Sequence, residues 1–100
     1  MYQVIELESF VEPWWFLDGW QRDIVAEADF TYLAPAQNFY EQSQRLLTEK
    51  YESCLCQKSH LTAFWNQTDC VWCEACAEEL QLYHGLILLE DWQEINSTKR

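Results

Sequence analysis

The sequence is poor in glycine, proline and basic residues. Its 100 residues include two Gly and two Pro, and six Lys and Arg stand against 17 Asp and Glu. A Gly-rich phosphate loop, a Gly-x-Ser-x-Gly nucleophile elbow and a His-Glu-x-x-His motif are all missing, so these three signatures of nucleotide-binding proteins and hydrolases are absent. The formal charge of -11 argues against nucleic acid and anionic membranes as ligands, because both are bound through clustered Lys and Arg.

Long apolar segments are also missing. No apolar run is longer than Leu86 to Leu89, whereas a membrane-spanning helix needs about 20 apolar residues. The first residues lack the basic and apolar regions of a signal peptide. Five cysteines are an odd number, and without an export signal they are expected to be reduced thiols. A cytoplasmic protein is therefore predicted.

Side chains that can form a core are abundant. The chain is 49% hydrophobic and 16% aromatic, a composition that excludes intrinsic disorder. A chain of this length has room for one core only. We expect a single α+β domain over residues 1–95, followed by a frayed C-terminal tail at 96–100.

Several segments have the pattern of β-strands. Trp14 to Leu17 suits a pleated surface, and Asp18-Gly19 is a favoured turn dipeptide, so a hairpin centred on Gly19 is predicted. An antiparallel sheet follows, because strand and helix segments do not alternate regularly. The expected strands lie near residues 2–8, 14–17, 20–26, 61–65 and 86–90.

A long helix and a shorter second helix are expected to pack on this sheet. Pro35 can occupy a first helical turn, and apolar residues from Ala36 to Tyr51 recur with a spacing near 3.6, which predicts a helix near 34–52. Residues 70–84 allow two interpretations. They form one helix with an apolar stripe, or Val71 and Trp72 end a hairpin with 61–65 before a helix begins close to Cys73; the second is preferred.

Cys73 and Cys76 form a Cys-x-x-Cys motif. At the start of a helix this motif can be a redox couple, because the helix N-terminus stabilises a thiolate. The adjacent Glu74 opposes thiolate formation, and no proline follows the motif, whereas thioredoxin-like sites use a late cis-proline. A redox site is therefore kept only as an alternative.

Zinc is a second alternative for the cysteines. Cys54 and Cys56 precede Cys73 and Cys76 by 16 intervening residues, a separation that zinc ribbons use. One residue between Cys54 and Cys56 suits a shared metal less well than two, although Cys70 and His60 could substitute as ligands. Reduced cysteines on buried faces are the favoured reading, because free Cys is often buried.

The two histidines give weak support for catalysis. His60 and His84 are the only imidazoles, and the His84-Gly85 pair is more typical of a hydrogen-bonded turn than of a general base. The carboxylates show no spacing that pairs an acid with a base. A protein without enzymatic activity is therefore favoured, although the question stays open.

Three tryptophans are the candidate interface residues. Trp14 and Trp15 are neighbours on a predicted strand, so they should face opposite sides, and Trp20 lies beyond the turn. Either the rest of the chain covers both sides, which is favoured, or one indole is exposed for binding.

The function expected from these features is binding of another protein or of a second copy of the chain. The negative charge would steer a basic partner toward it. The alternatives are a zinc or thiol-redox protein centred on Cys73 and Cys76, and a DNA mimic that occupies a nucleic-acid-binding protein. The DNA mimic ranks lower, because the carboxylates are spread along the chain without a phosphate-like row.

The sequence contains six short strings in a recognisable order. They are Glu12-Pro13-Trp14-Trp15-Phe16, Gly19-Trp20, Asp23-Ile24-Val25, Ala63-Phe64-Trp65-Asn66, Trp72-Cys73-Glu74-x-Cys76 and Tyr83-His84-Gly85-Leu86. Together they resemble an uncharacterised domain-of-unknown-function family, number 1033, of low-GC Gram-positive bacteria. The resemblance covers about residues 2 to 95 and implies a small cytoplasmic protein, with no reaction, cofactor or catalytic residue. Cys73 and Cys76 lie inside these strings, whereas Cys54, Cys56 and Cys70 lie outside, which lowers the expectation of a four-cysteine zinc site.

Overall fold

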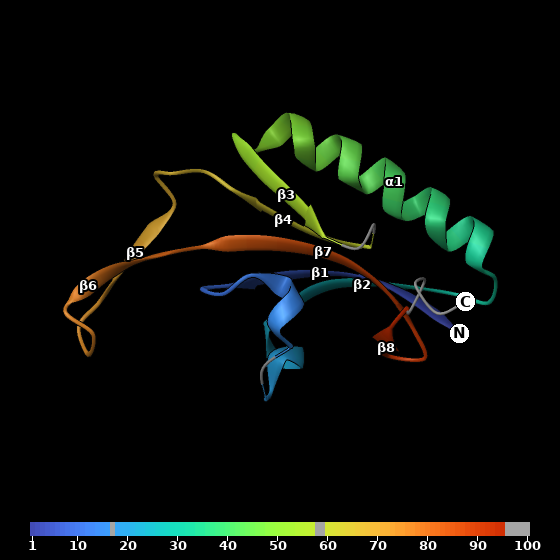
Figure 1. Cartoon of the computed structure of the whole chain (residues 1–100), viewed down its shortest axis with the longest axis horizontal. Helices are drawn as coiled ribbons and strands as arrows, with labels where there is room; N and C mark the ends of the chain where they lie inside the picture. Colours follow the sequence, from blue (N-terminus) through green and yellow to red (C-terminus); the bar gives the residue numbers. More distant parts are fainter. Residues whose placement is uncertain (17, 58–59, 96–100) are drawn as a thin grey trace.

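The computed structural model describes residues 1–16, 18–57 and 60–95 (Figure 1). The predicted frayed tail at 96–100 lies outside the described residues. The elements in chain order are β1 (Tyr2–Ser9), the 3₁₀ turns η1 (Pro13–Trp15) and η2 (Trp20–Asp23), β2 (Ile24–Phe30), α1 (Leu33–Lys50), β3 (Ser53–Gln57), β4 (Leu61–Trp65), β5 (Cys70–Cys73), β6 (Glu78–Gln81), β7 (Tyr83–Glu90) and β8 (Gln93–Glu94).

A six-stranded antiparallel sheet forms the centre of the fold. Its strands are ordered β2-β1-β7-β4-β3, and the short β8 pairs with β7. The central strand β7 pairs with β1 on one side, where Ile5 lies opposite Ile87, and with β4 on the other, where Leu61 lies opposite the same Ile87. The predicted α+β class, with an antiparallel sheet and one long helix, is confirmed.

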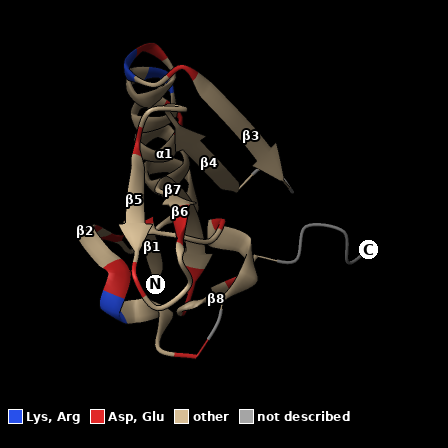
Figure 2. Ribbon diagram, turned by 90° about the vertical axis from the view of Figure 1, so that its left-hand side faces the viewer, with Lys and Arg blue, Asp and Glu red and all other residues tan. Residues whose placement is uncertain are grey.

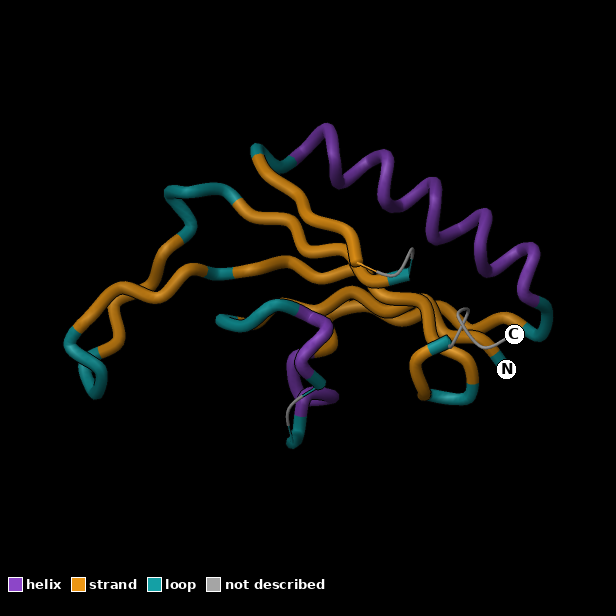
Figure 3. Tube along the Cα trace, viewed as in Figure 1, coloured by secondary structure: helices purple, strands orange, loops and turns teal. Residues whose placement is uncertain are grey.

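Both faces of the sheet are covered, by different parts of the chain. Because neighbouring side chains alternate between faces, Val4 and Leu88 pack with Tyr40 of α1, whereas Ile5 and Ile87 point to the other side. Figure 3 shows α1 above the sheet and the two 3₁₀ turns below it. The residues that pack on the second face are Trp14, Phe16, Trp20 and Ile24.

Three predicted strands and the long helix are confirmed. β1 covers the strand expected at 2–8 and adds one residue, and β4 has the expected bounds of 61–65. β7 includes the strand expected at 86–90 and begins earlier, at Tyr83. The helix α1 occupies 33–50, close to the predicted range. Its buried residues Ala36 and Tyr40 lie one turn apart, as the apolar periodicity indicated.

The predicted hairpin centred on Gly19 is wrong. Residues 14–17 form no strand in the described part of the segment, because Pro13 begins a 3₁₀ turn and Phe16 has a left-handed backbone with φ 48°. Gly19 is also left-handed, with φ 76°, and β2 starts only at Ile24 instead of residue 20. Since β1 pairs directly with β2, residues 10–23 form a long excursion between them, which we call the aromatic segment.

The predicted second helix near Cys73 is also wrong. In the described residues the only helix besides the 3₁₀ turns is α1. The segment forms the antiparallel pair β5 and β6, with Cys73 opposite Glu78, so Val71 and Trp72 do not pair with β4 as expected. Beyond the ends of the paired strands β4 and β7, the chain continues outward as the pair β5 and β6. The pairing of β5 with β6 overrides the helical pattern of residues 73–83.

This extension, residues 66–82, is called the arm. It leaves the sheet at a neck held by Gln81, whose Nε2 lies within hydrogen-bond distance of the carbonyl oxygens of Asn66 at 2.8 Å and Asp69 at 3.0 Å. The backbone N–H of Leu82 also donates to the Asp69 carbonyl at 2.8 Å. In Figure 1 the arm projects beyond the end of the sheet, away from α1.

Candidate functional site

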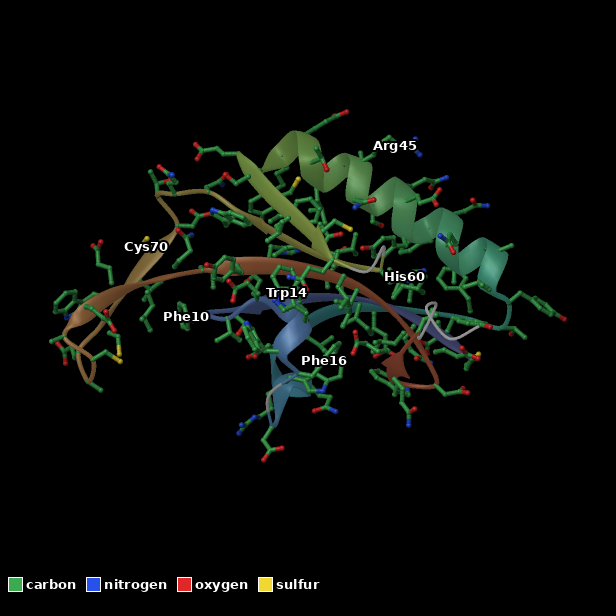
Figure 4. The ribbon with its side chains drawn as sticks, in the orientation of Figure 1. Phe10, Trp14, Phe16, Arg45, His60 and Cys70 are labelled. Carbon is green, nitrogen blue, oxygen red and sulfur yellow. The ribbon has the colours of Figure 1, made fainter. Side chains whose placement is uncertain are left out.

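The main candidate site is a pocket of about 360 Å³ under the aromatic segment. Leu7 of β1 and Gly85 of β7 contribute sheet residues to its lining, and Pro13 contributes from η1. Its volume lies in the range of pockets that bind small molecules or single side chains. Figure 4 shows Phe10, Trp14 and Phe16 on the face of the sheet opposite α1, where this pocket is found.

Aromatic side chains surround much of the pocket. Phe16 and Trp20 meet edge to face, with ring centroids 5.3 Å apart. Phe10, which is 45% exposed, and Tyr83 at the start of β7 complete the aromatic lining. Three of the four rings come from the aromatic segment and the fourth from β7, so the pocket depends on the tertiary fold.

The polar residues of the pocket are mainly acidic. Glu12, Asp18 and Asp23 line it together with one cation, Arg22. The Arg22 Nε donates to the Gly19 carbonyl oxygen at 3.3 Å, which ties the guanidinium to its own loop. Burial, and then the negative charge of Glu12, raise the pKa of the Tyr83 hydroxyl.

Trp15 lies next to the pocket. Its side chain is 59% exposed, and its indole Nε1 donates to Glu12 Oε1 at 2.9 Å. The three tryptophans named from the sequence thus have different positions. Trp14 is half-buried against the sheet, Trp20 is half-buried and lines the pocket, and Trp15 faces outward.

Cys73 and Cys76 are the one predicted cysteine pair that the structure brings together. Their sulfur atoms lie 2.9 Å apart in the turn between β5 and β6. Cys54 and Cys56 lie on the edge strand β3, and Cys70 stands at the start of β5 with its sulfur 3.4 Å from the Gln67 carbonyl oxygen.

All five cysteines are free, and all are exposed except Cys73, which is half-buried. The expectation of cysteines on buried faces is therefore wrong, because β3 is an edge strand and the arm stands clear of the core. No group of three or more His, Cys, Asp or Glu side chains within residues 1–16, 18–57 and 60–95 is arranged to hold a metal ion. Cys54 and Cys56 therefore do not form a shared metal site with Cys73 and Cys76 within one chain.

His84 lies on β7 rather than in a turn. It is buried, its Nε2 lies 2.9 Å from Glu6 Oε1, and its ring stacks on Tyr51 at a centroid distance of 5.5 Å. Burial, and then the charges of nearby carboxylates with Glu8 the largest, raise the pKa of the Tyr51 hydroxyl. His60 is also buried, on the side of the sheet that faces Tyr40. The pocket lining includes neither histidine.

Comparison with known protein families identifies the chain. The family model described as "Protein of unknown function (DUF1033)" matches residues 1–100. The chain belongs to DUF1033. No curated protein and no solved structure matches it. The family membership expected from the six sequence strings is confirmed.

The charged residues of this DUF1033 chain are unevenly placed. Figure 2 shows carboxylates on helix, sheet and turns, with basic residues in two places. These are Arg22 of η2, and Arg45 with Lys50 in α1. Among the described residues, no helix is long and apolar enough to cross a membrane.

Several pocket residues of the DUF1033 chain escaped the sequence analysis. Phe10, Arg22 and Tyr83 stand far apart in the sequence and carry no shared motif. Glu12 does lie inside the family-like string that ends in Trp15-Phe16, and Tyr83 is the first residue of the string that continues with His84-Gly85. The strings therefore held a partial signal for the pocket, but no pattern indicated that they meet.

Proposed function

We propose that this DUF1033 protein binds another protein through its pocket, which receives a Lys or Arg side chain of the partner and catalyses no reaction on it. The observation that carries the proposal is the combination of four aromatic rings and three carboxylates around about 360 Å³. Aromatic faces attract a cation by about 0.5 to 2 kcal/mol, and a carboxylate adds a charge-assisted hydrogen bond.

Charge complementarity favours a basic partner over a second copy. Each chain carries a formal charge of -11, so two copies repel one another at long range, whereas a basic protein is attracted. The pocket itself has three carboxylates and one guanidinium, and that guanidinium already bonds to Gly19. A Lys or Arg side chain of the partner that enters the pocket therefore meets an excess of negative charge.

Trp15 supplies the contact area beside the pocket. An exposed indole is the side-chain type most often found at the energetic centre of protein interfaces. Since Trp15 is held to Glu12, a partner side chain in the pocket and an apolar neighbour on Trp15 would bind at the same time. The proposal places this interaction in the cytoplasm, where five free thiols stay reduced.

The test uses two blocked tripeptides, Leu-Arg-Leu and Leu-Glu-Leu, titrated into isotopically labelled protein and followed by the indole N–H resonances. We expect Leu-Arg-Leu to shift the resonances of Trp15 and Trp20. Trp72 is the matched control, because it is 57% exposed against 59% for Trp15 but lies on the arm. Glu12→Gln keeps an acceptor for Trp15 and removes one charge, so it should weaken binding several-fold, whereas Trp72→Ala should leave it unchanged.

Three outcomes would overturn the proposal. Preference for Leu-Glu-Leu would mean that Arg22 selects an anion. Shifts centred on Trp72 would move the binding surface to the arm. A dimer that forms with rising concentration in sedimentation, and that Trp15→Ala abolishes, would show that a second copy occupies this surface.

A further inference from the structure

The arm ends in two cysteines that interact directly. The Cys76 thiol lies 2.9 Å from the Cys73 sulfur, and the backbone N–H of Cys76 also donates to that sulfur at 3.3 Å. The turn that brings them together spans Cys73 to Cys76 and is followed by Ala77, whose φ of 55° lets the chain reverse into β6. Cys73 thus receives two hydrogen bonds from one residue.

These hydrogen bonds give the two thiols different chemical properties. Donation from the Cys76 thiol, and then from its backbone N–H, lowers the pKa of Cys73, although burial and the charge of Glu78 oppose this. The same thiol–thiol hydrogen bond raises the pKa of Cys76. Cys73 is therefore the more acidic thiol of the pair and Cys76 the less acidic one, and no helix N-terminus is needed for this difference.

The pair is accessible to another molecule. Cys76 is exposed, Cys73 is half-buried, and the neighbouring Trp72 is 57% exposed. Because the arm projects from the sheet (Figure 1), a large substrate can approach the turn without meeting α1. Trp72, the preceding residue on β5, adds an exposed apolar surface to the same arm.

A metal site within one chain is disfavoured by the number of ligands. Structural zinc takes four ligands, and in the described residues no third His, Cys, Asp or Glu joins the pair in an arrangement that could hold a metal ion. Two sulfurs in contact, with one activated, match the requirement of thiol–disulfide exchange instead.

We propose that Cys73 and Cys76 are a dithiol site that reduces accessible disulfides, with Cys73 as the attacking sulfur and Cys76 as the resolving one. The Cys73 thiolate attacks one sulfur of the substrate disulfide, whose other sulfur leaves as a thiolate and takes a proton. Cys76 then loses its proton to solvent and attacks the Cys73 sulfur, which releases the second substrate thiolate. Two electrons pass to the substrate, and the protein is left with a Cys73–Cys76 disulfide.

A low-molecular-weight thiol returns the site to the reduced form. Two such thiols give up two electrons and two protons and become a disulfide. This activity is independent of the pocket on the second face of the sheet.

The test uses oxidised glutathione as the disulfide and mass spectrometry to locate each product. In a background with Cys54, Cys56 and Cys70 replaced by Ser, we expect the Cys73–Cys76 disulfide with release of two glutathione thiols. Cys76→Ser should trap glutathione on Cys73, whereas Cys73→Ser should react at least tenfold more slowly. If the variant with three serines does not fold, peptide mapping of the wild-type protein, with all five cysteines present, can show which cysteines react with glutathione.

Two results would overturn the dithiol site. The first is equal reaction of the Cys73→Ser and Cys76→Ser variants, at the rate of a blocked Trp-Cys-Glu-Ala-Cys peptide, because the folded turn would then confer no activation. The second is tightly bound zinc at one ion per two chains in protein purified under reducing conditions, because the pair would then be half of a metal site between two copies.

Discussion

Gly85 of β7 lies directly against Pro13 of the aromatic segment. A Cβ on Gly85 would stand 2.7 Å from the Pro13 Cβ and 3.0 Å from its Cγ. Both distances are shorter than carbon atoms tolerate without a shift of the backbone or ring. The absence of a side chain at Gly85 therefore lets η1 approach the central strand and close the second face of the sheet.

Gly85→Ala should destabilise the fold by about 1 to 3 kcal/mol, the usual effect of an added methyl group in a packed contact. Urea unfolding followed by tryptophan fluorescence measures this. Combining it with Pro13→Gly removes the opposing ring, so the double variant should lose less than the sum of the two single losses. Additive losses would show that the contact is not what selects glycine.

Trp14 and Trp15 should differ sharply in their contribution to stability. Trp14→Ala removes an indole that packs on the second face of the sheet and should lower the free energy of unfolding by about 2 kcal/mol or more. Trp15→Ala removes an exposed indole and should change it by about 0.5 kcal/mol or less. Equal losses in urea unfolding would mean that both indoles are structural, and Trp15 would no longer be an interface candidate.

Tyr40 should make stability depend on pH in the alkaline range. Burial is the main cause that raises the pKa of its hydroxyl above the ordinary value of 10.0, so the unfolded chain ionises first. Its contribution is full below pH 10 and is lost as the pH rises toward the folded-state pKa. Tyr40→Phe also loses the 2.7 Å hydrogen bond to Thr62, which should destabilise the protein by about 1 kcal/mol at pH 7.

Unfolding of wild type and Tyr40→Phe is compared between pH 7 and 11. The gap between the two should shrink as the pH rises, because only the wild type has this tyrosine to ionise. Gln44 still donates to Thr62 at 3.1 Å in the variant, so a large loss at pH 7 is not expected. A gap that stays constant would show that Tyr40 ionises normally in the fold.

Cys73 should be alkylated at a lower pH than Cys76. Hydrogen bonds from Cys76 hold the pKa of Cys73 below its ordinary value of 9.0, and the pKa of Cys76 lies above it. Mass spectrometry can follow the rate of alkylation by iodoacetamide at each cysteine as the pH is raised. The midpoint of this rate increase should therefore lie at a lower pH for Cys73 than for Cys76. Since the charge of Glu78 opposes the Cys73 thiolate, Glu78→Gln should lower that midpoint further.

Glu79→Gln is the matched control for this titration. Glu79 neighbours Glu78 on β6 but is not among the groups that shift Cys73, so its replacement should leave the midpoint where it is. Cys76→Ser keeps a hydroxyl donor and should preserve part of the shift, whereas Cys76→Ala should remove the side-chain contribution. One common midpoint for both cysteines in the wild type would contradict the asymmetry.

The sequence predicted the elements whose local pattern agrees with their packing. Ala36 and Tyr40 of the expected apolar stripe are the buried residues of α1, although Phe39 and Leu46 of the same stripe are exposed. The segment expected as a strand at 61–65 is the buried strand β4. The predictions failed at Trp14 and Cys73. In the first segment Pro13 and the left-handed Phe16 prevent a regular strand. In the second, local hairpin pairing of β5 with β6 overrides the helical pattern.

The candidate site was only partly predictable for a related reason. Trp20 and the Cys73–Cys76 motif could be named because they stand in short, recognisable strings. Phe10 and Tyr83 could not, since they reach the pocket from opposite ends of the chain, where β1 pairs with β7 and Ser9 lies opposite Tyr83. Such long-range pairing is not encoded in any local pattern.

The position of β7 between β1 and β4 constrains the order in which the protein can form during synthesis. Before residues 83–90 leave the ribosome, β1 with β2 and β3 with β4 can exist only as two separate hairpins, each too small to be stable alone in water. Their apolar faces stay unmatched until β7 inserts between them. The nascent chain should therefore remain open to chaperones and proteases until β7 emerges, and a truncation before Tyr83 should yield protein that is rapidly degraded.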